Sequence, residues 1–547
     1  GRWGGGGGES DSSTTSMFDC TFDGNEAEFG GGIYSEAGTL SIDSCVFTDH
    51  AAGIGGGLYS YGTSVTVTGS DFLGNSVYWD GGGIAANWGD LVVNASRFDN
   101  NEANFLGGGI SIYGTSTQIT DCRISENIAG ETGGGLQISK TVVTVTDTMF
   151  CANLPNHVAG EITGSGIEFL DVCPATWTVD DDGKADFDNI QAAVNAASDG
   201  DEILVYPGTY TGDGYNVIDL MGKSLWLHSS DGPAATIIDG EYERRGILYE
   251  NVINGTIEGF TIQNCRAEPF DYGPGIYQLG GGIFILNASI GIHNCIIDNN
   301  DTTGSGIGWG AGVFCQWSDE IVVTDCTFTN NRTDRSGGGL AILSSTVQMN
   351  DCTFDNNDTS GANLGWGGGF YTSNTDATYA NCTFTNNTAD RDGAGIFHYS
   401  STFELENCSI KFNTAVEGGG GLALQNGSGI ATQCTISHNT AVTGLLGTLG
   451  AGILNYQGEI TLADTTVCGN NPDQINGSWI DNGGNTVADE CPIDCPDING
   501  DGNVDVSDLL IVIAYWGSPD SPADINGDGI VDVSDLLIVV GNWGPCE

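Results

Sequence analysis

Two stretches near the end of the sequence place oxygen-bearing side chains at the spacing of a calcium loop. DINGDGNVDVSDLLIVIAYWG at 497–517 recurs as DINGDGIVDVSDLLIVVGNWG at 524–544. The first repeat offers Asp497, Asn499, Asp501, the backbone carbonyl of Asn503, Asp505 and Asp508, and the second offers Asp524, Asn526, Asp528, the backbone carbonyl of Ile530, Asp532 and Asp535. Gly502 and Gly529 stand at the sixth position, where calcium loops turn sharply. We therefore expect two calcium ions, one in each loop.

A second group of residues that could do chemistry lies around DCTFTNNRTDRSGGGL at 325–340. Arg335 and Arg391 each stand two residues before a glycine run or its variant GAGI, and tryptophans directly precede other runs. Guanidinium groups and aromatic faces suit an acidic or a neutral glycan. The alternative is a structural turn, in which arginine pairs with aspartate and tryptophan covers the core. The candidate glycan contacts are Arg335, Arg391, Trp309, Trp366, Asp334 and Asp392, and no residue is assigned as catalytic.

Most of the 17 cysteines belong to a repeated phrase, and six others fall into three pairs. Cys151 with Cys173 and Cys468 with Cys491 occupy matching places, while Cys495 and Cys546 bracket the C-terminal repeats. These pairs are interpreted as disulfides, which predict an oxidising, secreted or cell-surface location. The repeated cysteines, such as Cys326 and Cys352, are more typical of small buried hydrophobic residues than of metal ligands.

The charge of the chain limits its partners. The formal net charge is -58, with only 13 Lys and Arg among 547 residues. A negative field of this size excludes nucleic acid and anionic membrane as partners. No apolar run is as long as a membrane span. The sequence begins with Gly1 rather than Met, so we expect a processed or partial chain.

The candidate glycan contacts and the repeated cysteines lie within a sequence repeat of about 26 residues. GGGI or GGGL begins at Gly30, Gly55, Gly81, Gly107 and Gly133, and a second series of glycine runs extends from Gly280 to Gly450. Segments between the runs alternate apolar and polar residues, which predicts strands of four to six residues, about three to a coil. A parallel β-solenoid has this period, with coils stacked about 4.8 Å apart.

The same repeat predicts which side chains stack inside. The interior columns are Ile33, Leu58, Ile84, Ile110 and Leu136; Val313, Leu340, Phe370, Ile396, Leu422 and Ile453; Phe22, Phe47, Phe72 and Phe98; Phe328, Phe354 and Phe384; and Cys326, Cys352, Cys382, Cys408 and Cys434. Asparagine pairs such as Asn330–Asn331 and Asn356–Asn357 mark one turn of each coil, where their amides could bond from coil to coil.

A segment between the two glycine series predicts a helix. In DFDNIQAAVNAASDGDEILVYPGTY, Asp188 and Gln191 form a candidate capping box, and Ile190, Ala193, Val194 and Ala197 share one face. We expect this helix to cap a fresh solenoid. The predicted domains are a first solenoid at 1–175, a second with a helical cap at 176–494, and the calcium module at 495–547. The first solenoid leads almost directly into a coil, so either upstream sequence precedes it or its open end receives a neighbour.

The GGGI and CTF phrases resemble the repeats of polymorphic outer-membrane proteins and, more broadly, the right-handed parallel β-helix proteins of the pectate-lyase-like class. The resemblance covers about residues 15 to 490 and implies an all-β fold. Enzymes of this class act on polysaccharides, but the complete set of NTD, DD and GHG motifs of polygalacturonases is not found here, nor is the DPHE-like motif of mannuronan epimerases.

The C-terminal repeats resemble a type I dockerin, a small all-α calcium module that docks on a cohesin. In that family loop positions ten and eleven, often Ser-Thr, make the contact. Here those positions are Val506-Ser507 and Val533-Ser534, a departure from the pattern. The resemblance implies a cohesin-like or surface-protein partner.

Two functions follow from these observations. The first is an extracellular structural or adhesive protein, a β-helical rod with calcium-dependent docking that assembles head-to-tail into a filament. The second is a polysaccharide lyase or hydrolase tethered by its dockerin. The first is favoured because no catalytic set is found.

Overall fold

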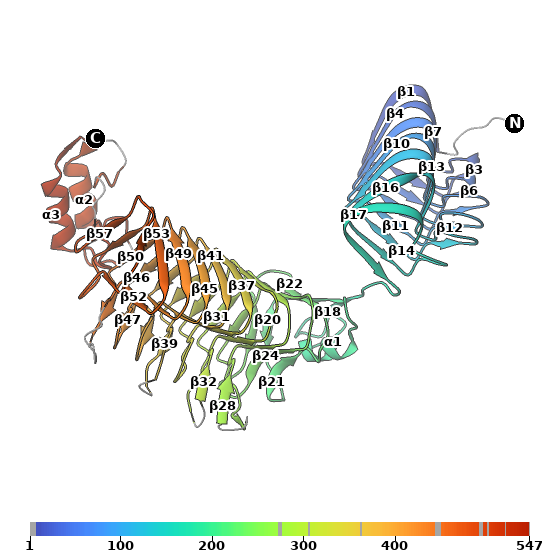
Figure 1. Ribbon diagram of the computed structural model, residues 1–547. Helices are drawn as coiled ribbons and strands as arrows, with labels where there is room; N and C mark the ends of the chain where they lie inside the picture. Colours follow the sequence, from blue (N-terminus) through green and yellow to red (C-terminus); the bar gives the residue numbers. More distant parts are fainter. Residues whose placement is uncertain are drawn as a thin grey trace. The chain divides into compact units, whose positions relative to one another are not determined.

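The computed structural model describes residues 7–271, 276–304, 307–361, 364–442, 450–491, 496–499, 503–519 and 521–545. The chain forms two compact units, Gly1–Cys173 and Pro174–Glu547. In each unit the strands pair in parallel with those of the next coil, which gives a β-helix (Figure 1). The predicted fold class, parallel β-helix with a small helical module, is confirmed.

The first unit has three series of parallel strands. The long strands are β1 (Gly8–Phe18), β4 (Ile33–Asp43), β7 (Leu58–Thr68), β10 (Ile84–Asn94), β13 (Ile110–Thr120), β16 (Leu136–Cys151) and β17 (Val158–Leu170). The short strands of the same sheet are β2 (Thr21–Asp23), β5 (Val46–Thr48), β8 (Asp71–Leu73), β11 (Arg97–Asp99) and β14 (Arg123–Ser125). A separate five-stranded sheet contains β3 (Glu26–Phe29), β6 (Ala51–Ile54), β9 (Ser76–Val77), β12 (Glu102–Ala103) and β15 (Ile128–Ala129).

Strand length in the first unit differs from the expectation of four to six residues. Strands such as β7 and β10 have 11 residues each, because the pairing continues through a corner instead of stopping there. Gly62 takes the corner with φ 63° and Trp88 with φ 57°. The register holds on both sides, with Asn87 opposite Tyr61 and Gly89 opposite Thr63.

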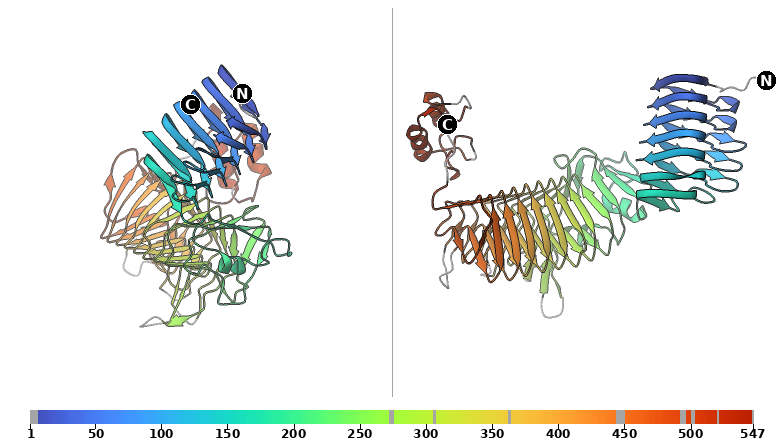
Figure 2. Two further views of the ribbon diagram at one scale, coloured as in Figure 1. Left: turned by 90° about the vertical axis from the view of Figure 1, so that its right-hand side faces the viewer. Right: turned by 45° about the horizontal axis from the view of Figure 1, so that its top comes forward.

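The second unit has three long sheets (Figure 2). The first sheet contains β18 (Thr176–Val179), β19 (Glu202–Val205), β22 (Trp226–Ser229), β25 (Gly255–Glu258), β30 (Ile290–His293), β34 (Ile321–Thr324), β37 (Thr346–Asn350), β41 (Asp376–Ala380), β45 (Thr402–Glu406), β49 (Ser428–Thr432), β53 (Glu459–Ala463) and β56 (Ile480–Asp481). The second sheet contains β20 (Gly208–Tyr210), β23 (Thr236–Asp239), β26 (Thr261–Gln263), β31 (Ile296–Asp298), β35 (Thr327–Thr329), β38 (Thr353–Asp355), β42 (Thr383–Thr385), β46 (Ser409–Lys411), β50 (Thr435–Ser437), β54 (Thr466–Cys468) and β57 (Thr486–Ala488). The third sheet contains β21 (Asn216–Asp219), β24 (Arg245–Glu250), β29 (Ile283–Leu286), β33 (Val313–Gln316), β36 (Leu340–Leu343), β40 (Phe370–Ser373), β44 (Ile396–Tyr399), β48 (Leu422–Gln425), β52 (Ile453–Tyr456) and β55 (Ile475–Asn476).

Turn segments between the second and third sheets add two small sheets. One contains β27 (Phe270–Asp271), β28 (Ile276–Leu279) and β32 (Ile307–Trp309). The other contains β39 (Asp358–Thr359), β43 (Thr388–Ala389), β47 (Thr414–Ala415) and β51 (Thr440–Ala441).

The predicted interior columns are confirmed. In the first unit Ile33 pairs with Leu58 and Ile84 with Ile110, and all four are buried. The rings of Phe47 and Phe72 stack with centroids 4.7 Å apart, and those of Phe328 and Phe354 stack at 4.4 Å. The repeated cysteines of the second unit are buried free thiols; Cys326, for example, donates to the carbonyl of Thr324 at 3.2 Å.

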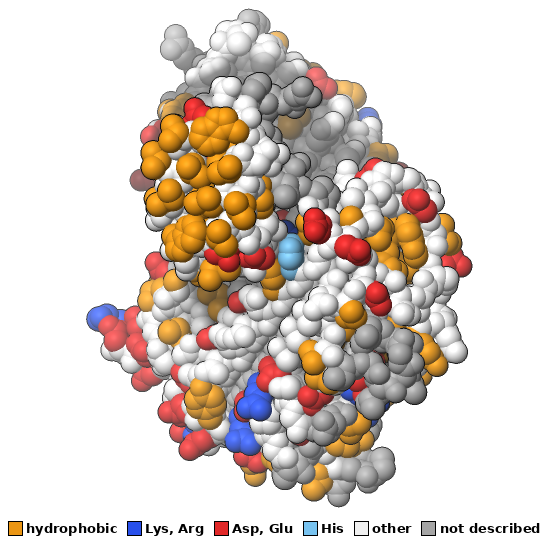
Figure 3. All heavy atoms as spheres, turned by 90° about the vertical axis from the view of Figure 1, so that its left-hand side faces the viewer, with side chains coloured by type: hydrophobic (Ala, Val, Ile, Leu, Met, Phe, Trp, Pro, Cys, Tyr) orange, Lys and Arg blue, Asp and Glu red, His pale blue; other side chains and the backbone are white. Residues whose placement is uncertain are grey.

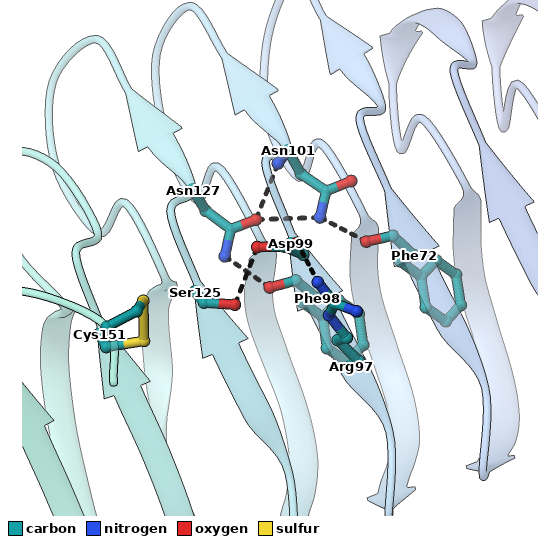
Figure 4. Close-up of polar contacts among 9 residues, drawn as sticks. Phe72, Arg97, Phe98, Asp99, Asn101, Ser125, Asn127 and Cys151 are labelled. Atoms are coloured by element: carbon teal, nitrogen blue, oxygen red, sulfur yellow. Dashed lines mark hydrogen bonds and ion pairs between the residues drawn. A yellow bond between two sulfur atoms is a disulfide. The ribbon is translucent and has the colours of Figure 1, made fainter. Parts of the chain in front are cut away.

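A buried asparagine ladder stabilises one corner of each β-helix. In Figure 4 the Asn101 amide donates to the Phe72 carbonyl at 2.8 Å and to Asn127 Oδ1 at 2.9 Å. Asn127 Oδ1 also accepts from the Asn101 backbone N–H at 2.9 Å. His50 takes one position in the ladder, where its Nδ1 accepts from the backbone N–H of Asn25 at 3.0 Å. Because these amides are fully bonded, burying them costs little.

Helix α1 (Ile190–Ala196) covers the start of the second β-helix, and its buried residues Ile190, Ala193 and Val194 join the core. The expected capping box is wrong. The N-cap is Asn189, whose side chain accepts from the backbone N–H of Ala192. Gln191 instead bonds to the backbone of Asp219 and, within the helix, to Asn195.

The C-terminal module contains β58 (Asn503–Val504), α2 (Val506–Ala514), α3 (Val533–Gly541) and β59 (Gly544–Pro545). Its own small core is built from Val504, Val512, Ala523, Val531 and Val539.

Candidate functional site

In the second predicted calcium loop, 524–535, the side-chain oxygens of Asp524 and Asn526 accept hydrogen bonds from the backbone of the loop. Asp524 accepts from the backbone N–H groups of Asp528 at 3.1 Å and Gly529 at 2.8 Å. Asn526 Oδ1 accepts from Asp528 N–H at 2.9 Å, which curls the chain around these groups. Burial raises the pKa of Asp524, and the nearby carboxylates of Asp535 and Asp528 raise it further. A divalent cation relieves this crowding of negative charge, so the donor set fits calcium.

The last carboxylate of each loop is buried. Asp508 and Asp535 are 0 % exposed. Asp508 Oδ1 accepts from Ile498 N–H at 2.7 Å and its Oδ2 from Asp505 N–H at 2.9 Å. Burial raises the pKa of Asp508, but these backbone donors outweigh it and hold the pKa below its usual range.

The remaining predicted ligands are less fully defined. Asp501 and Gly502 lie outside the described residues. Within the described residues, no group of three or more His, Cys, Asp or Glu side chains gathers as a metal site. Asp497, Asn499, Asn503, Asp505, Asp528, Ile530 and Asp532 are described in the two loops, and their role as calcium ligands stays a prediction.

Each loop leads directly into a helix through a capping box. Asp505 caps α2 and Asp532 caps α3, with reciprocal bonds to Asp508 and Asp535. The capping aspartates satisfy N–H groups that the first helical turn leaves unpaired.

Both helices carry a large exposed apolar face, here called the docking face. One valine of each helix, Val512 on α2 and Val539 on α3, is buried in the module core, while large apolar side chains face outward. Figure 3 shows hydrophobic side chains gathered in one field on the face that α2 and α3 present. The docking face contains Val506, Leu510, Ile513 and Trp516, matched by Val533, Leu537, Val540 and Trp543.

Two of the three predicted disulfides are formed. Cys151–Cys173 and Cys468–Cys491 have Cα atoms 4.9 Å and 4.8 Å apart. Cys495 and Cys546 lie outside the described residues.

The candidate glycan residues form an alternating stack, here called the Trp–Arg column: Trp309, Arg335, Trp366 and Arg391. The guanidinium carbon of Arg335 lies 5.4 Å from the Trp309 ring centroid and 5.9 Å from that of Trp366. That of Arg391 lies 5.0 Å from Trp366. Ser336 bridges the backbones of Trp309 and Trp366, which fixes the order of the stack.

The two candidate aspartates, Asp334 and Asp392, lie in turns of the second β-helix. Asp334 Oδ1 accepts from the Gly308 N–H at 2.7 Å. Burial raises the pKa of Asp392 to about 6, with a further contribution from Glu417, while Arg391 and a hydrogen bond with Trp366 oppose the rise. Arg391 itself pairs with Glu417 at 3.2 Å.

Sequence reasoning missed a cleft of about 740 Å³ on the outer face of the third sheet. Its floor is apolar, and a projecting turn that contains β28 and β32 contributes to its wall. The lining residues include Leu279, Phe284, Leu286, Trp309, Phe314 and Trp317, with Glu250 and Glu268 as the carboxylates. The signal was present: Phe284 and Phe314 follow the inward residues Ile283 and Val313, where alternation favours a polar residue.

Arg245 lies in the cleft, and each of its three side-chain nitrogens donates one hydrogen bond. Its Nε donates to Gly280 O at 3.0 Å, its Nη1 to Asn216 Oδ1 at 2.9 Å and its Nη2 to Leu279 O at 3.1 Å. Burial lowers its pKa to about 10, so it remains charged at neutral pH. We infer that Arg245 fixes the turn between β28 and β29.

Comparison with known families agrees with this architecture. The family model described as "Right handed beta helix region" matches residues 6–169 and 234–402, more than half of the chain. The chain belongs to the right-handed β-helix family. A second model, "Dockerin type I domain", matches residues 496–542 of this β-helix protein, so the C-terminal module is a dockerin.

Similar solved structures include two enzymes. The pectin methylesterase from Aspergillus niger in deglycosylated form is 10 % identical, with a TM-score of 0.27 over 58 % of this chain and 90 % of that chain. The rice weevil pectin methyl esterase is 14 % identical, with a TM-score of 0.28 over 52 % of this chain and 88 % of that chain. Similarity this low carries no information on activity. No curated protein matches the sequence.

The dockerin and the disulfides are consistent with an extracellular or cell-surface protein. Among the described residues, none of the helices is both long and apolar enough to span a membrane.

Proposed function

We propose that this β-helix protein is an extracellular structural or adhesive module whose dockerin attaches it, in the presence of calcium, to a cohesin-like partner. The observation that carries the proposal is the docking face. Two repeated segments expose the same large apolar side chains, Leu510 and Leu537 among them, at 58 % and 60 %. Apolar surface of this kind, matched on two helices, is typical of a protein-binding face.

Calcium supports docking by ordering the loops. Each loop supplies the N-cap of its helix, so a bound ion would hold both the loop and the start of the docking face. Asp524, Asn526, Asp528, the carbonyl of Ile530, Asp532 and Asp535 would hold one ion, and the equivalent residues of the first loop the other.

The partner surface is expected to be apolar. Valine occupies loop position ten in both repeats, and Val506 and Val533 are each 53 % exposed. A cohesin-like surface with apolar side chains opposite these valines fits better than one that offers hydrogen bonds.

Binding of the full chain to an immobilised type I cohesin tests the proposal. The expected result is binding in millimolar calcium that is lost in chelator. Absence of binding to any cohesin in calcium would contradict it. We also propose that copies of the chain assemble head-to-tail into a filament. Negative-stain images of the full chain test this assembly, and dispersed monomers in every condition would contradict it.

A second candidate function is polysaccharide binding in the cleft, and the aromatic floor favours it. Sugar rings have apolar faces that stack on aromatic side chains such as Phe284, Phe314 and Trp309, and the carboxylates of Glu250 and Glu268 can accept from hydroxyl groups. Calorimetry with a neutral hexasaccharide, comparing wild type with Phe314→Ala, tests this function. A lyase or hydrolase activity would also release unsaturated or reducing ends.

A further inference from the structure

Arg335 is the one arginine of the second β-helix that has no hydrogen bond or ion pair with the described residues. Its Nε is buried and has no acceptor among those residues. The other arginines are all bonded: Arg244 to Glu241, Arg245 to Gly280 and Leu279, Arg266 to Thr303, Arg332 to Asp358 and Arg391 to Glu417. An unpaired guanidinium is notable in a chain with a formal net charge of -58.

The surroundings of Arg335 hold it in place without neutralising it. The indoles of Trp309 and Trp366 lie on either side of it, at 5.4 Å and 5.9 Å. The adjacent Asp334 uses its Oδ1 for the Gly308 N–H. Cation–π contacts orient a guanidinium but leave its N–H groups in the ring plane free to donate.

Arg335 also adjoins the cleft. Trp309, which it contacts, lines the cleft at the end of β32. A ligand whose rings lie on the aromatic floor would therefore bring its next groups towards Arg335.

The overall charge restricts what those groups can be. With 71 Asp and Glu against 13 Lys and Arg, the chain repels a polyanion. A single anionic group, in contrast, meets one guanidinium that lacks a counter-charge.

We propose that Arg335 binds one carboxylate or sulfate group carried by an otherwise neutral sugar chain whose rings lie in the cleft. This inference rests on the second candidate function. It goes beyond that function in two respects: the ligand carries one negative charge, and Arg335 is the residue that binds this charge.

Calorimetry on the full chain in millimolar calcium tests the inference with four hexasaccharides of one backbone. They are neutral, singly carboxylated at one end, singly sulfated at one end, and carboxylated on every ring. Wild type is expected to bind a singly charged ligand about tenfold more tightly than the neutral one. The polyanion is expected to bind no more tightly than the singly charged ligands.

Two variants test whether Arg335 causes the difference in affinity between charged and neutral ligands. Arg335→Gln removes the charge and should abolish the tenfold difference between the singly charged ligands and the neutral one. Arg332→Gln, in the same turn but paired with Asp358 at 3.5 Å, should retain it. Unchanged circular dichroism verifies that both variants are folded.

The outcomes separate the two proposals. If the neutral ligand binds and the charged ligands bind equally, the inference is wrong and the cleft function stands. Retention of the difference in Arg335→Gln, or tightest binding of the polyanion, also overturns the inference. If none of the four ligands binds, the cleft function fails and the inference with it.

Discussion

Leu510 on α2 and Leu537 on α3 occupy the same position in two repeated segments, and both point away from the module core. They are 58 % and 60 % exposed, whereas Val512 and Val539, two residues further along, are fully buried. Each helix therefore has a narrow face that packs into the module core and a wide apolar face that is exposed to solvent. A solitary module gains nothing from exposing such side chains, which is why we assign this face to a partner.

Calcium binding should occur with two ions per chain. Asp524→Ala removes the carboxylate that accepts from Asp528 and Gly529, so the second loop should lose its ion and the stoichiometry should fall from two to one. Native mass spectrometry measures this count. Asp231→Ala, an exposed carboxylate of the β-helix, serves as the control and should keep both ions. A stoichiometry that Asp524→Ala leaves at two would place the ion elsewhere.

The asparagine ladder should contribute strongly to stability. Asn357 Oδ1 accepts from the backbone N–H and the amide of Asn331, at 3.1 Å and 3.0 Å. Asn357→Ala leaves both buried donors without an acceptor and should lower the free energy of unfolding by about 3 kcal/mol or more. Denaturant unfolding and hydrogen exchange of β35 and β38 measure the loss.

The neighbouring residue supplies the control for the ladder. Asn356 lies on the surface with φ 55°. Asn356→Ala should cost only about 1 kcal/mol, since alanine is less favourable in this left-handed conformation. Equal losses for the two variants would mean that the ladder does not stabilise the coil in this way.

The ladder and the columns could be predicted because a fixed period places one residue of every coil at one corner. Cys326, Phe328 and Leu340 recur at offsets that stacking at about 4.8 Å turns into columns. The apolar floor of the cleft left a signal in Phe284 and Phe314, but its wall could not be predicted, since it is an insertion around β28 and β32 that departs from the repeat. The helix cap was misplaced by one residue because Asp188 and Asn189 are both good N-cap residues, and only the backbone geometry decides between them.

The candidate site divides in the same way. The sequence predicted that Arg335 and Trp366 lie on the same edge of the β-helix. It did not predict that the arginines and tryptophans alternate in one stack, because this depends on how successive coils are offset from one another. Nothing in the composition shows that Asp358 and Glu417 neutralise two arginines and leave a third, Arg335, unpaired.

Acid should destabilise the second β-helix through His398. This residue is fully buried, its Nε2 has no hydrogen-bond partner in the part of the chain that the structure describes, and burial lowers its pKa to about 3. The unfolded chain binds the proton below pH ~6.5, so the stability is complete above that pH and falls by about 1.4 kcal/mol per pH unit towards pH ~3.

His398→Leu should remove this term. When the pH falls from ~7 to ~4.5, the free energy of unfolding measured with guanidinium should decrease by about 3 kcal/mol more for wild type than for the variant. The remaining acid sensitivity, from carboxylates common to both proteins, cancels in the difference. A difference that does not change with pH would show that His398 is not held neutral.

The docking face is tested most directly by the double variant Leu510→Asp/Leu537→Asp. Its affinity for an immobilised type I cohesin in millimolar calcium is compared with that of wild type and of Ile253→Asp, which places a charge on an exposed site of the β-helix. Burying two carboxylates in an apolar interface should weaken binding at least a hundredfold, with both calcium ions retained. Ile253→Asp should bind as wild type does. Wild-type affinity in the double variant would contradict the assignment of α2 and α3 as the docking face.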